Sequence, residues 1–448
     1  MRETRHAQAS IFEHYSNHEY GIKLQKLSEV LDRQPEILNL VAADLIDASV
    51  SAVGRTGLSA ESVLRCLVLR QQLGCSYEQL AFHLSDSVTY RTFTRLPAQL
   101  SPSRSCLQST IRRITPETLE QAHQDQALTR NLMREGVLSM DKLRIDSTVV
   151  ASHIAPPSDS QLLNDGVRVI SRLLAKSNAD TGLKIRFTDK RKASKSLAFR
   201  IFNAKKAAKD ELYPDLLKIA RLVLKQADRG QRQVLEGGDG SAAQQKWLDA
   251  LAHYRELMSR VIEQTERRVI QGERVPSSDK LVSLFEPHTD IIVKGFRDVQ
   301  YGHKINLSSE VSGFITALTI EEGNPGDKTL FLPILDFHRS VLGKLPCAVV
   351  ADGGYASQAN VAAGRAMGLK HVVFHKPVGV SLTAMGVKSK TFNALRHFRA
   401  GVEGNISELK RAFGAAKAKW KGHDGFKAFV WASALSYNLV RLARLGPD

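Results

Sequence analysis

Three acidic residues occupy positions where a carboxylate is unusual. Asp146 interrupts the apolar segment RIDSTVV, and Asp352 directly follows the apolar segment AVVA. Glu403 has a basic residue, Arg399, four positions before it on a predicted helix. An unpaired carboxylate inside a buried strand is costly, and functional side chains commonly follow the carboxyl ends of core strands. Each acid also has a plainer interpretation: the aspartates could open turns, and Glu403 could form an exposed helical ion pair.

If these three carboxylates meet, they repel one another unless cations neutralise them. Oxygen ligands of this kind suit Mg²⁺, with Mn²⁺ as an alternative, and such ions keep waters for substrate phosphates. Two such ions can support an in-line displacement at a phosphodiester. No P-loop, G-x-G-x-x-G, H-E-x-x-H or G-x-S-x-G motif supports a competing chemistry.

The elements around the acids predict how the three could meet. Asp146 lies in a β-branched, alternating segment over 137–151, and Asp352 ends a short buried strand. Between them, 300–309 and 313–322 flank a turn, as in an antiparallel hairpin. When the helical block 160–275 is set aside, the predicted order is βββαβαβα, ending on the helix of Glu403. This order predicts a mixed α/β fold with an RNase H-like core, a mixed sheet flanked by helices, and a long helical insertion after its first strand.

The first 137 residues predict an all-helical domain, and we assign 138–448 to the catalytic domain with its insertion at 160–275. Within 59–84, Ser59 is a predicted N-cap and Gly74 a predicted helix end. Two helices joined by a tight turn are compatible with a helix-turn-helix that binds DNA. A packed helical hairpin used for dimerisation has the same pattern.

Positive charge is concentrated in two segments of the chain. The 448 residues carry a formal net charge of +17, and 176–210 and 388–448 each account for +8 of it. Clustered charge of one sign usually has a polyanionic partner, and release of phosphate counterions would make that binding salt-dependent. The plainer alternative is a solvated helix face, while a membrane surface is disfavoured because neither segment has a continuous apolar face.

Composition and cysteine usage predict an ordinary globular protein of the cytoplasm. Hydrophobic residues make up 43% and charged residues 24% of the chain, and no apolar run is long enough for a membrane span. The polar start MRETRHAQAS does not have the pattern of a secretory signal. Four cysteines without a C-x-x-C pair argue against a disulfide scaffold.

At these residues the chain resembles the DDE insertion-sequence transposases, most closely the ISNCY type. The resemblance is carried by GLSAESVLRCLVLRQQLGCSYEQLAFHL, RIDSTVV, FEPHTDIIVKG, YGHKINLS, VVADGGYAS and FRAGVEGNISELKRAFG, in this order. It implies Asp146, Asp352 and Glu403 as metal-binding catalytic acids, with Mg²⁺ as the expected ion. It also implies double-stranded DNA as partner, both terminal inverted repeats and target, and an oligomer of at least two copies. The location would then be the cytoplasm, with the nucleoid.

The last of these segments contains R-x3-E-x6-K as Arg399, Glu403 and Lys410, like the Y-R-E-K signature of related transposases. The tyrosine of that signature corresponds to Arg396 here, so no tyrosine-specific role is implied. We expect Arg399 and Lys410 to contact phosphates, the alternative being a helical ion pair. In the insertion we expect five basic residues to bind the DNA backbone: Lys190, Arg191, Lys192, Lys205 and Lys206.

Three further residues and two other functions complete the expectations. His303 and Lys304 are predicted to face solvent at a strand edge, the alternative being that they face the DNA. Trp420 is predicted to anchor a turn to the core, the alternative being that it stacks on an unpaired base. An RNase H-like nuclease that does not join strands is a second hypothesis, and a domesticated DNA-binding regulator is a third. The regulator predicts the loss of an acid from the trio, but all three are present.

Overall fold

The computed structural model describes residues 3–5, 15–46, 57–97, 99–125, 128–294, 298–375 and 379–445. The chain forms two compact units, one made of 1–152 with 303–448 and the other of 153–302. The predicted boundary at 137/138 does not separate compact bodies, because the N-terminal helices share one core with the last helix of the chain. The second unit contains the predicted insertion 160–275 and extends beyond it at both ends.

The first unit is built on a mixed sheet. Its strands are β1 (Lys142–Ala151), β3 (Asp298–Ser309, which enters this unit at His303), β4 (Ile315–Ile320), β5 (Ala348–Ala351) and β6 (His371–Phe374). Their order across the sheet is β4, β3, β1, β5, β6. Strands β1, β5 and β6 are parallel, whereas β3 and β4 form the antiparallel hairpin that the sequence predicts. The expected mixed α/β architecture is therefore confirmed.

The helices of this half of the unit follow the predicted order. They are α13 (Phe331–Ser340), α14 (Gln358–Ala366), α15 (Leu382–Met385), α16 (Ser389–Ala412) and α17 (His423–Leu445), with single 3-10 turns at Asp327–Leu330 and Gly353–Tyr355. The Gly- and Ser-rich sequence of 377–390 is typical of a linker, but its described part, from Gly379 on, contains α15 and the start of α16. Ser381 caps α15 through its side chain, and Gly386 ends it at φ 57°, a conformation that favours glycine.

The N-terminal region is helical, as predicted. Its helices are α1 (Glu19–Asp32), α2 (Pro35–Leu45), α3 (Ala60–Leu73), α4 (Tyr77–Asp86), α5 (Val88–Thr94), α6 (Arg104–Ile111), α7 (Pro116–Glu120) and α8 (Thr129–Arg134), with a π turn at Gln121–Asp125. The sequence from Pro116 to about Arg134 predicts one helix, with Pro116 at its first position. The observed chain is helical in two parts, and 126–127 lie outside the described residues.

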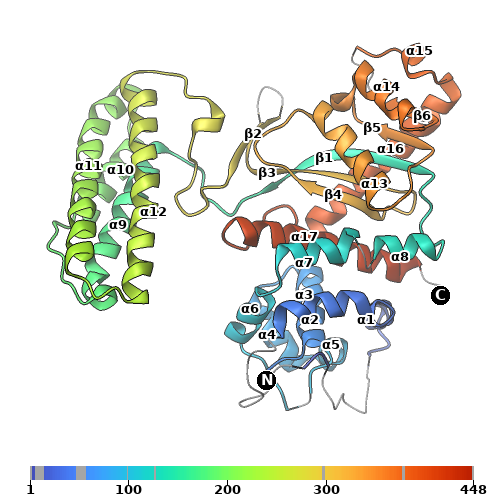
Figure 1. The fold of residues 1–448 in the computed structure, drawn as a ribbon, viewed down its shortest axis with the longest axis horizontal. Helices are drawn as coiled ribbons and strands as arrows, with labels where there is room; N and C mark the ends of the chain where they lie inside the picture. The colour runs from blue at the N-terminus through green and yellow to red at the C-terminus, as the bar shows by residue number, and fades with distance from the viewer. Residues whose placement is uncertain are drawn as a thin grey trace. The chain divides into compact units, whose positions relative to one another are not determined.

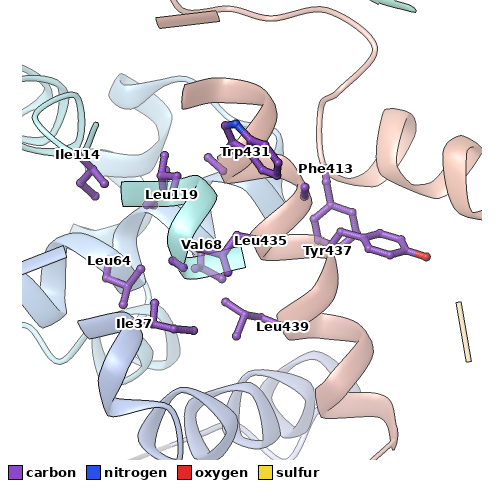
Figure 2. Packing of buried hydrophobic residues seen from close by; sticks show 14 of the residues in the cluster. Ile37, Leu64, Val68, Ile114, Leu119, Phe413, Trp431, Leu435, Tyr437 and Leu439 are labelled. Atoms are coloured by element: carbon purple, nitrogen blue, oxygen red, sulfur yellow. The ribbon is translucent and has the colours of Figure 1, made fainter. Parts of the chain in front are cut away.

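Helix α17 is apolar around most of its circumference and joins the two halves of this unit. It packs against α1, α3 and α7 on the N-terminal side and against β4 of the sheet (Figure 1). Figure 2 shows Ile37 of α2 and Val68 of α3 gathered with Leu435 and Leu439 of α17. A helix that is apolar all round is buried on all sides, and this explains why the N-terminal helices and the sheet form one body.

The second unit consists of four helices and one short strand. These are α9 (Asp159–Thr181), α10 (Arg191–Asn203), α11 (Lys206–Gly237) and α12 (Ala242–Thr265), followed by a π turn (Glu266–Ile270), a 3-10 turn (Ser277–Asp279) and β2 (Asp290–Lys294), which pairs with residues 298–302 of β3. Figure 1 shows the four helices lying side by side. The glycine-rich stretch 230–240 is typical of a break between two helices, and the break is found at its end, since α11 continues to Gly237 and α12 begins at Ala242. A side chain at Gly230 would come within 3.0 Å of Leu174, so glycine serves close packing there.

None of the helices in the described part of the chain is both long and apolar enough to cross a membrane.

Candidate active site

The parallel pairing of β1 with β5 places the two aspartates side by side. The register aligns Lys142 with Ala348 and Ile145 with Ala351, so Asp146 and Asp352 are the next residues of adjacent strands. The Asp146 side chain is 15% exposed and the Asp352 side chain is 42% exposed. The two carboxylates therefore lie side by side where β5 ends beside the middle of β1, one nearly buried and one open to solvent.

Helix α16 is docked against this part of the sheet by a buried polar network. Arg144 of β1 donates from Nε to the Ser309 hydroxyl at 2.9 Å and from Nη1 to the Phe398 carbonyl at 3.1 Å. The Asn405 amide donates to the same Ser309 oxygen at 2.9 Å. A side chain at Gly401 would lie 2.0 Å from the Arg144 guanidinium, so glycine is required for this close approach. These contacts fix the rotation of the helix that contains Arg399 and Glu403.

The three acids that the sequence singled out meet around one guanidinium. Arg399 donates to Asp146 Oδ2 at 2.8 Å and to Glu403 Oε1 at 2.7 Å, and its Nη2 lies 3.6 Å from Asp352 Oδ1. The Arg399 side chain is 9% exposed, whereas that of Glu403 is 67% exposed. Two strands and one helix, far apart in the sequence, thus bring their carboxylates to a common cation.

The side chains of the three acids are chemically suited to bind a divalent cation. Their donor atoms are carboxylate oxygens, the ligands that Mg²⁺ and Mn²⁺ prefer, and the acids already surround one positive group. Among the described residues, however, the oxygens of the three acids do not all come within 4.8 Å of one another. The guanidinium stands between them, so we expect an ion to compete with Arg399 for these carboxylates.

A layer of residues beneath the acids was not anticipated from the sequence. Asp327, at the start of the 3-10 turn before α13, accepts from the Ser147 hydroxyl at 3.0 Å and from Lys304 Nζ at 3.1 Å. Lys304 also donates to the Pro325 carbonyl at 2.6 Å. Ser147 in turn donates its backbone N–H to Asp146 Oδ1 at 2.8 Å. A fourth carboxylate is therefore connected to Asp146 through one residue.

Tyr355 is buried in the same layer. Its hydroxyl donates to Asn306 Oδ1 at 2.8 Å. Burial first, and then the charges of Asp327 and Asp146, raise the pKa of this phenol well above its usual range. A side chain at Gly354 would lie 2.8 Å from Asp327 Oδ2, which explains one of the two glycines after Asp352. The signal that could have found this layer is the aspartate in GNPGDKTL, but its neighbours there give no hint of a partner.

The expectation for His303 and Lys304 is wrong. Both are buried, at 2% and 6% exposure. The His303 ring stacks on His423 with centroids 5.3 Å apart, and Lys304 is held by Asp327 as described above. Successive residues of a strand point to opposite faces of a sheet: His303 lies against His423 and Phe426 of α17, and Lys304 against Pro325 and Asp327. Trp420 is 4% exposed and lies in the main core, which confirms that it anchors its turn.

The basic residues predicted to bind DNA lie in both units. Lys410 lies seven residues beyond Glu403 on α16, within the first unit. In the second unit, Lys190 precedes α10, Lys192 and Lys205 are exposed, and Arg191 is exposed and paired with Asp189 at 2.6 Å. The side chain of Lys206 lies outside the described residues.

The predicted pair of helices at 59–84 is present as α3 and α4. The Ser59 hydroxyl caps α3, and Gly74 ends it with φ 59°. The spacing of Val63, Leu64 and Leu67 predicts one buried stripe on α3, but residues 60–71 are all buried. Arg65 is 1% exposed between Glu61 and Asp32. Only α4 offers an exposed face in this pair. Whatever this pair binds must therefore meet α4 or its flanks.

A mixed sheet of this order, with Asp146 in its central strand, Asp352 just after the adjacent strand and Glu403 on a helix packed against them, is typical of an RNase H-like core. Comparison with known families agrees with this assignment. Residues 300–439 match the family described as Transposase DDE domain, and residues 12–113 match the family described as Transposase domain (DUF772). The chain is therefore a transposase of the DDE class, and its core is RNase H-like. This class implies dependence on a divalent metal ion and DNA as the substrate. No curated protein and no solved structure matches the chain significantly.

Proposed function

We propose that this transposase cleaves and joins phosphodiester bonds at the ends of an insertion sequence, with Asp146, Asp352 and Glu403 as its catalytic acids. The observation that carries the proposal is the meeting of the three carboxylates around Arg399, with distances of 2.7 to 3.6 Å. Mg²⁺, or Mn²⁺ in its place, would activate the attacking oxygen and stabilise the leaving oxygen when bound by these acids.

The residues of the chain have separate tasks in this proposal. Asp146, nearly buried and held by the Ser147 N–H, provides a fixed oxygen, whereas the exposed Glu403 can adjust to the substrate. Arg399 holds the acids in place before DNA arrives and is close enough to contact a phosphate beside them. Lys410, farther along α16, is proposed to bind the adjoining phosphate.

Charge outside the acid cluster supports a DNA substrate bound over an extended surface. The segments 176–210 and 388–448 each carry a net charge of +8. We propose that Lys190, Arg191, Lys192, Lys205 and Lys206 bind the backbone of the terminal inverted repeats or the target. We further propose assembly of at least two copies on the two ends of the element, an ISNCY-type lineage, and action on nucleoid DNA in the cytoplasm.

The test uses the DNA that flanks the gene as donor. The purified full chain is incubated with Mg²⁺, a labelled donor carrying both candidate ends, and a supercoiled target plasmid. Nicked donor ends that become joined to the plasmid support the proposal. Cleavage without joined product, in Mg²⁺ and in Mn²⁺, would instead favour the nuclease hypothesis. Binding without any cleavage would favour the non-catalytic regulator.

A further inference from the structure

Helix α10 presents two phenylalanines to solvent. Phe199 is 70% exposed and Phe202 is 74% exposed, the highest values among the large apolar side chains of the described residues. These two side chains are not needed to pack the helix, because Ser194, Ala198 and Ile201 form its buried face. The two phenylalanines lie three positions apart, so they are neighbours on the outer surface of the helix.

The same face is strongly basic. The helix Arg191–Asn203 contains four basic residues and no acidic one. Lys195 is one turn before Phe199, and Arg200 lies between the two rings in sequence; both cations are exposed. An aromatic pair interleaved with cations is the composition of surfaces that hold unpaired nucleic acid, in which bases stack on rings and phosphates meet the charges.

The rings border a groove rather than a flat surface. A cavity of about 600 Å³ lies between α10 and the start of α9. It is lined by Lys195, Phe199 and Phe202 from α10 and by polar side chains of residues 158–168, among them Asp165 and Arg168, from the other side. The one acid in this lining, Asp165, is neutralised by Arg168 at 2.8 Å. The groove therefore offers hydrogen-bonding side chains and no unpaired negative charge.

The spacing of the rings selects between paired and unpaired DNA. Side chains three apart on a helix have Cβ atoms about 5–6 Å apart, whereas successive bases of a duplex strand are about 3.4 Å apart. Two rings at this spacing fit two successive bases only when those bases are unstacked. Bases of an intact duplex also present their edges, not their faces.

We propose that the groove between α9 and α10 binds an unpaired stretch of DNA, with Phe199 and Phe202 stacking on bases and Lys195 and Arg200 contacting phosphates. The inference deepens the proposed function, since it rests on DNA being the substrate. It assigns the binding of unpaired DNA to the second unit.

The test compares two DNA probes with the full-length chain. Fluorescence anisotropy measures binding of a labelled 12-nucleotide oligo(dT) and of a labelled hairpin duplex. A stack on an aromatic ring contributes about 1–3 kcal/mol per base, so F199A/F202A should weaken oligo(dT) binding at least 10-fold and duplex binding less than 2-fold. F199W should keep its affinity, and DNA should quench the fluorescence of the introduced indole.

Two further variants distinguish ring stacking from simple apolar contact. F199L/F202L keeps the apolar surface but removes the rings, so it should lose oligo(dT) affinity as the alanine variant does. L235A, at an exposed leucine (61%) on α11 of the same unit, is the matched control and should bind both probes normally. Circular dichroism melts confirm that each variant folds.

Three results would overturn the inference. If the leucine variant binds oligo(dT) like the parent, the groove is an apolar docking surface. If the parent and F199L/F202L form the same oligomer and F199A/F202A does not, the groove is occupied by a second copy of the chain. If the duplex binds and oligo(dT) binding does not depend on the rings, this inference fails while the proposed function stands. A parent chain that binds neither probe refutes both.

Discussion

Removing the Arg399 guanidinium tests whether the three acids depend on one cation. In R399Q, Asp146 keeps the bond from the Ser147 N–H but loses a charged partner at 2.8 Å, although its side chain is only 15% exposed. Removing one partner of a buried pair costs about 3–5 kcal/mol. Arg399 also forms ion pairs with Glu403 and Asp352, whose side chains are 67% and 42% exposed. Solvent screening limits the stabilisation from each of these pairs to about 0–1 kcal/mol. Asp146 therefore dominates, and we expect a loss of about 3 kcal/mol.

The same substitution should strengthen binding of divalent ions. Without the guanidinium, the main positive competitor for the carboxylates is gone, so Mg²⁺ should bind at least ~10-fold tighter, which corresponds to about 1.4 kcal/mol. Added Mg²⁺ should also recover much of the lost stability, because it binds the folded state alone. Cleavage should nevertheless fall, since Arg399 is proposed to contact the substrate.

Urea unfolding with and without Mg²⁺, and calorimetric titration of the ion, measure the two effects. R339Q is the matched control: Arg339 is 60% exposed and pairs with Asp336 at 2.7 Å on the surface of the same unit. It should change neither stability nor ion affinity appreciably. An R399Q chain with the stability and ion affinity of R339Q would refute the reasoning, because the guanidinium would then not be holding the acids.

Three further predictions concern other parts of the molecule. Burial lowers the pKa of His338 to about 3 from its ordinary 6.5. As the pH falls below 6.5, this histidine is therefore protonated in the unfolded chain but not in the folded one. Its contribution should lower the free energy of unfolding by up to about 1.4 kcal/mol per pH unit. The urea midpoint of H338Q should accordingly depend less on pH than that of the parent. K304M should destabilise by about 1–3 kcal/mol by leaving Asp327 with an unmatched charge, and K304M/D327N should unfold at higher urea than K304M, whereas a lower midpoint would exclude the pairing. Replacing residues 190–192 and Lys205 with glutamine should weaken duplex binding and make it less dependent on salt concentration. An unchanged salt dependence would indicate that these cations serve solubility instead.

The sequence predicts the sheet and the positions of the two aspartates in it, because both depend on local patterns. The alternation around Asp146 and the apolar run before Asp352 each define a strand, and the order of elements then allows few topologies. The parallel register that aligns Ile145 with Ala351 follows once these strands are neighbours. The positions of both aspartates thus follow from patterns within a dozen residues.

Contacts between distant segments account for what the sequence did not predict. Lys304 was assigned to solvent because lysine usually is, but Asp327, more than twenty residues away, compensates its burial. The unit boundary was missed for a related reason. Helix α17 is the last element of the chain, yet it completes the core of the first helices, and nothing within either segment indicates the other.

Single-turnover cleavage of a donor end by D146N, D352N, E403Q and the double variant D146N/D352N is the most direct test of the central claim. Duplex affinity, measured in parallel, should remain within about 3-fold of the parent, because the acids are not proposed to provide binding energy. Groups that act as one unit are strongly non-additive. We therefore expect each single substitution to lower the cleavage rate at least ~10³-fold, about 4 kcal/mol, and the double variant to be no slower than the slower single one. A single variant that cleaves at a near-parental rate, or a double variant whose losses multiply, would contradict the claim that these carboxylates form one site.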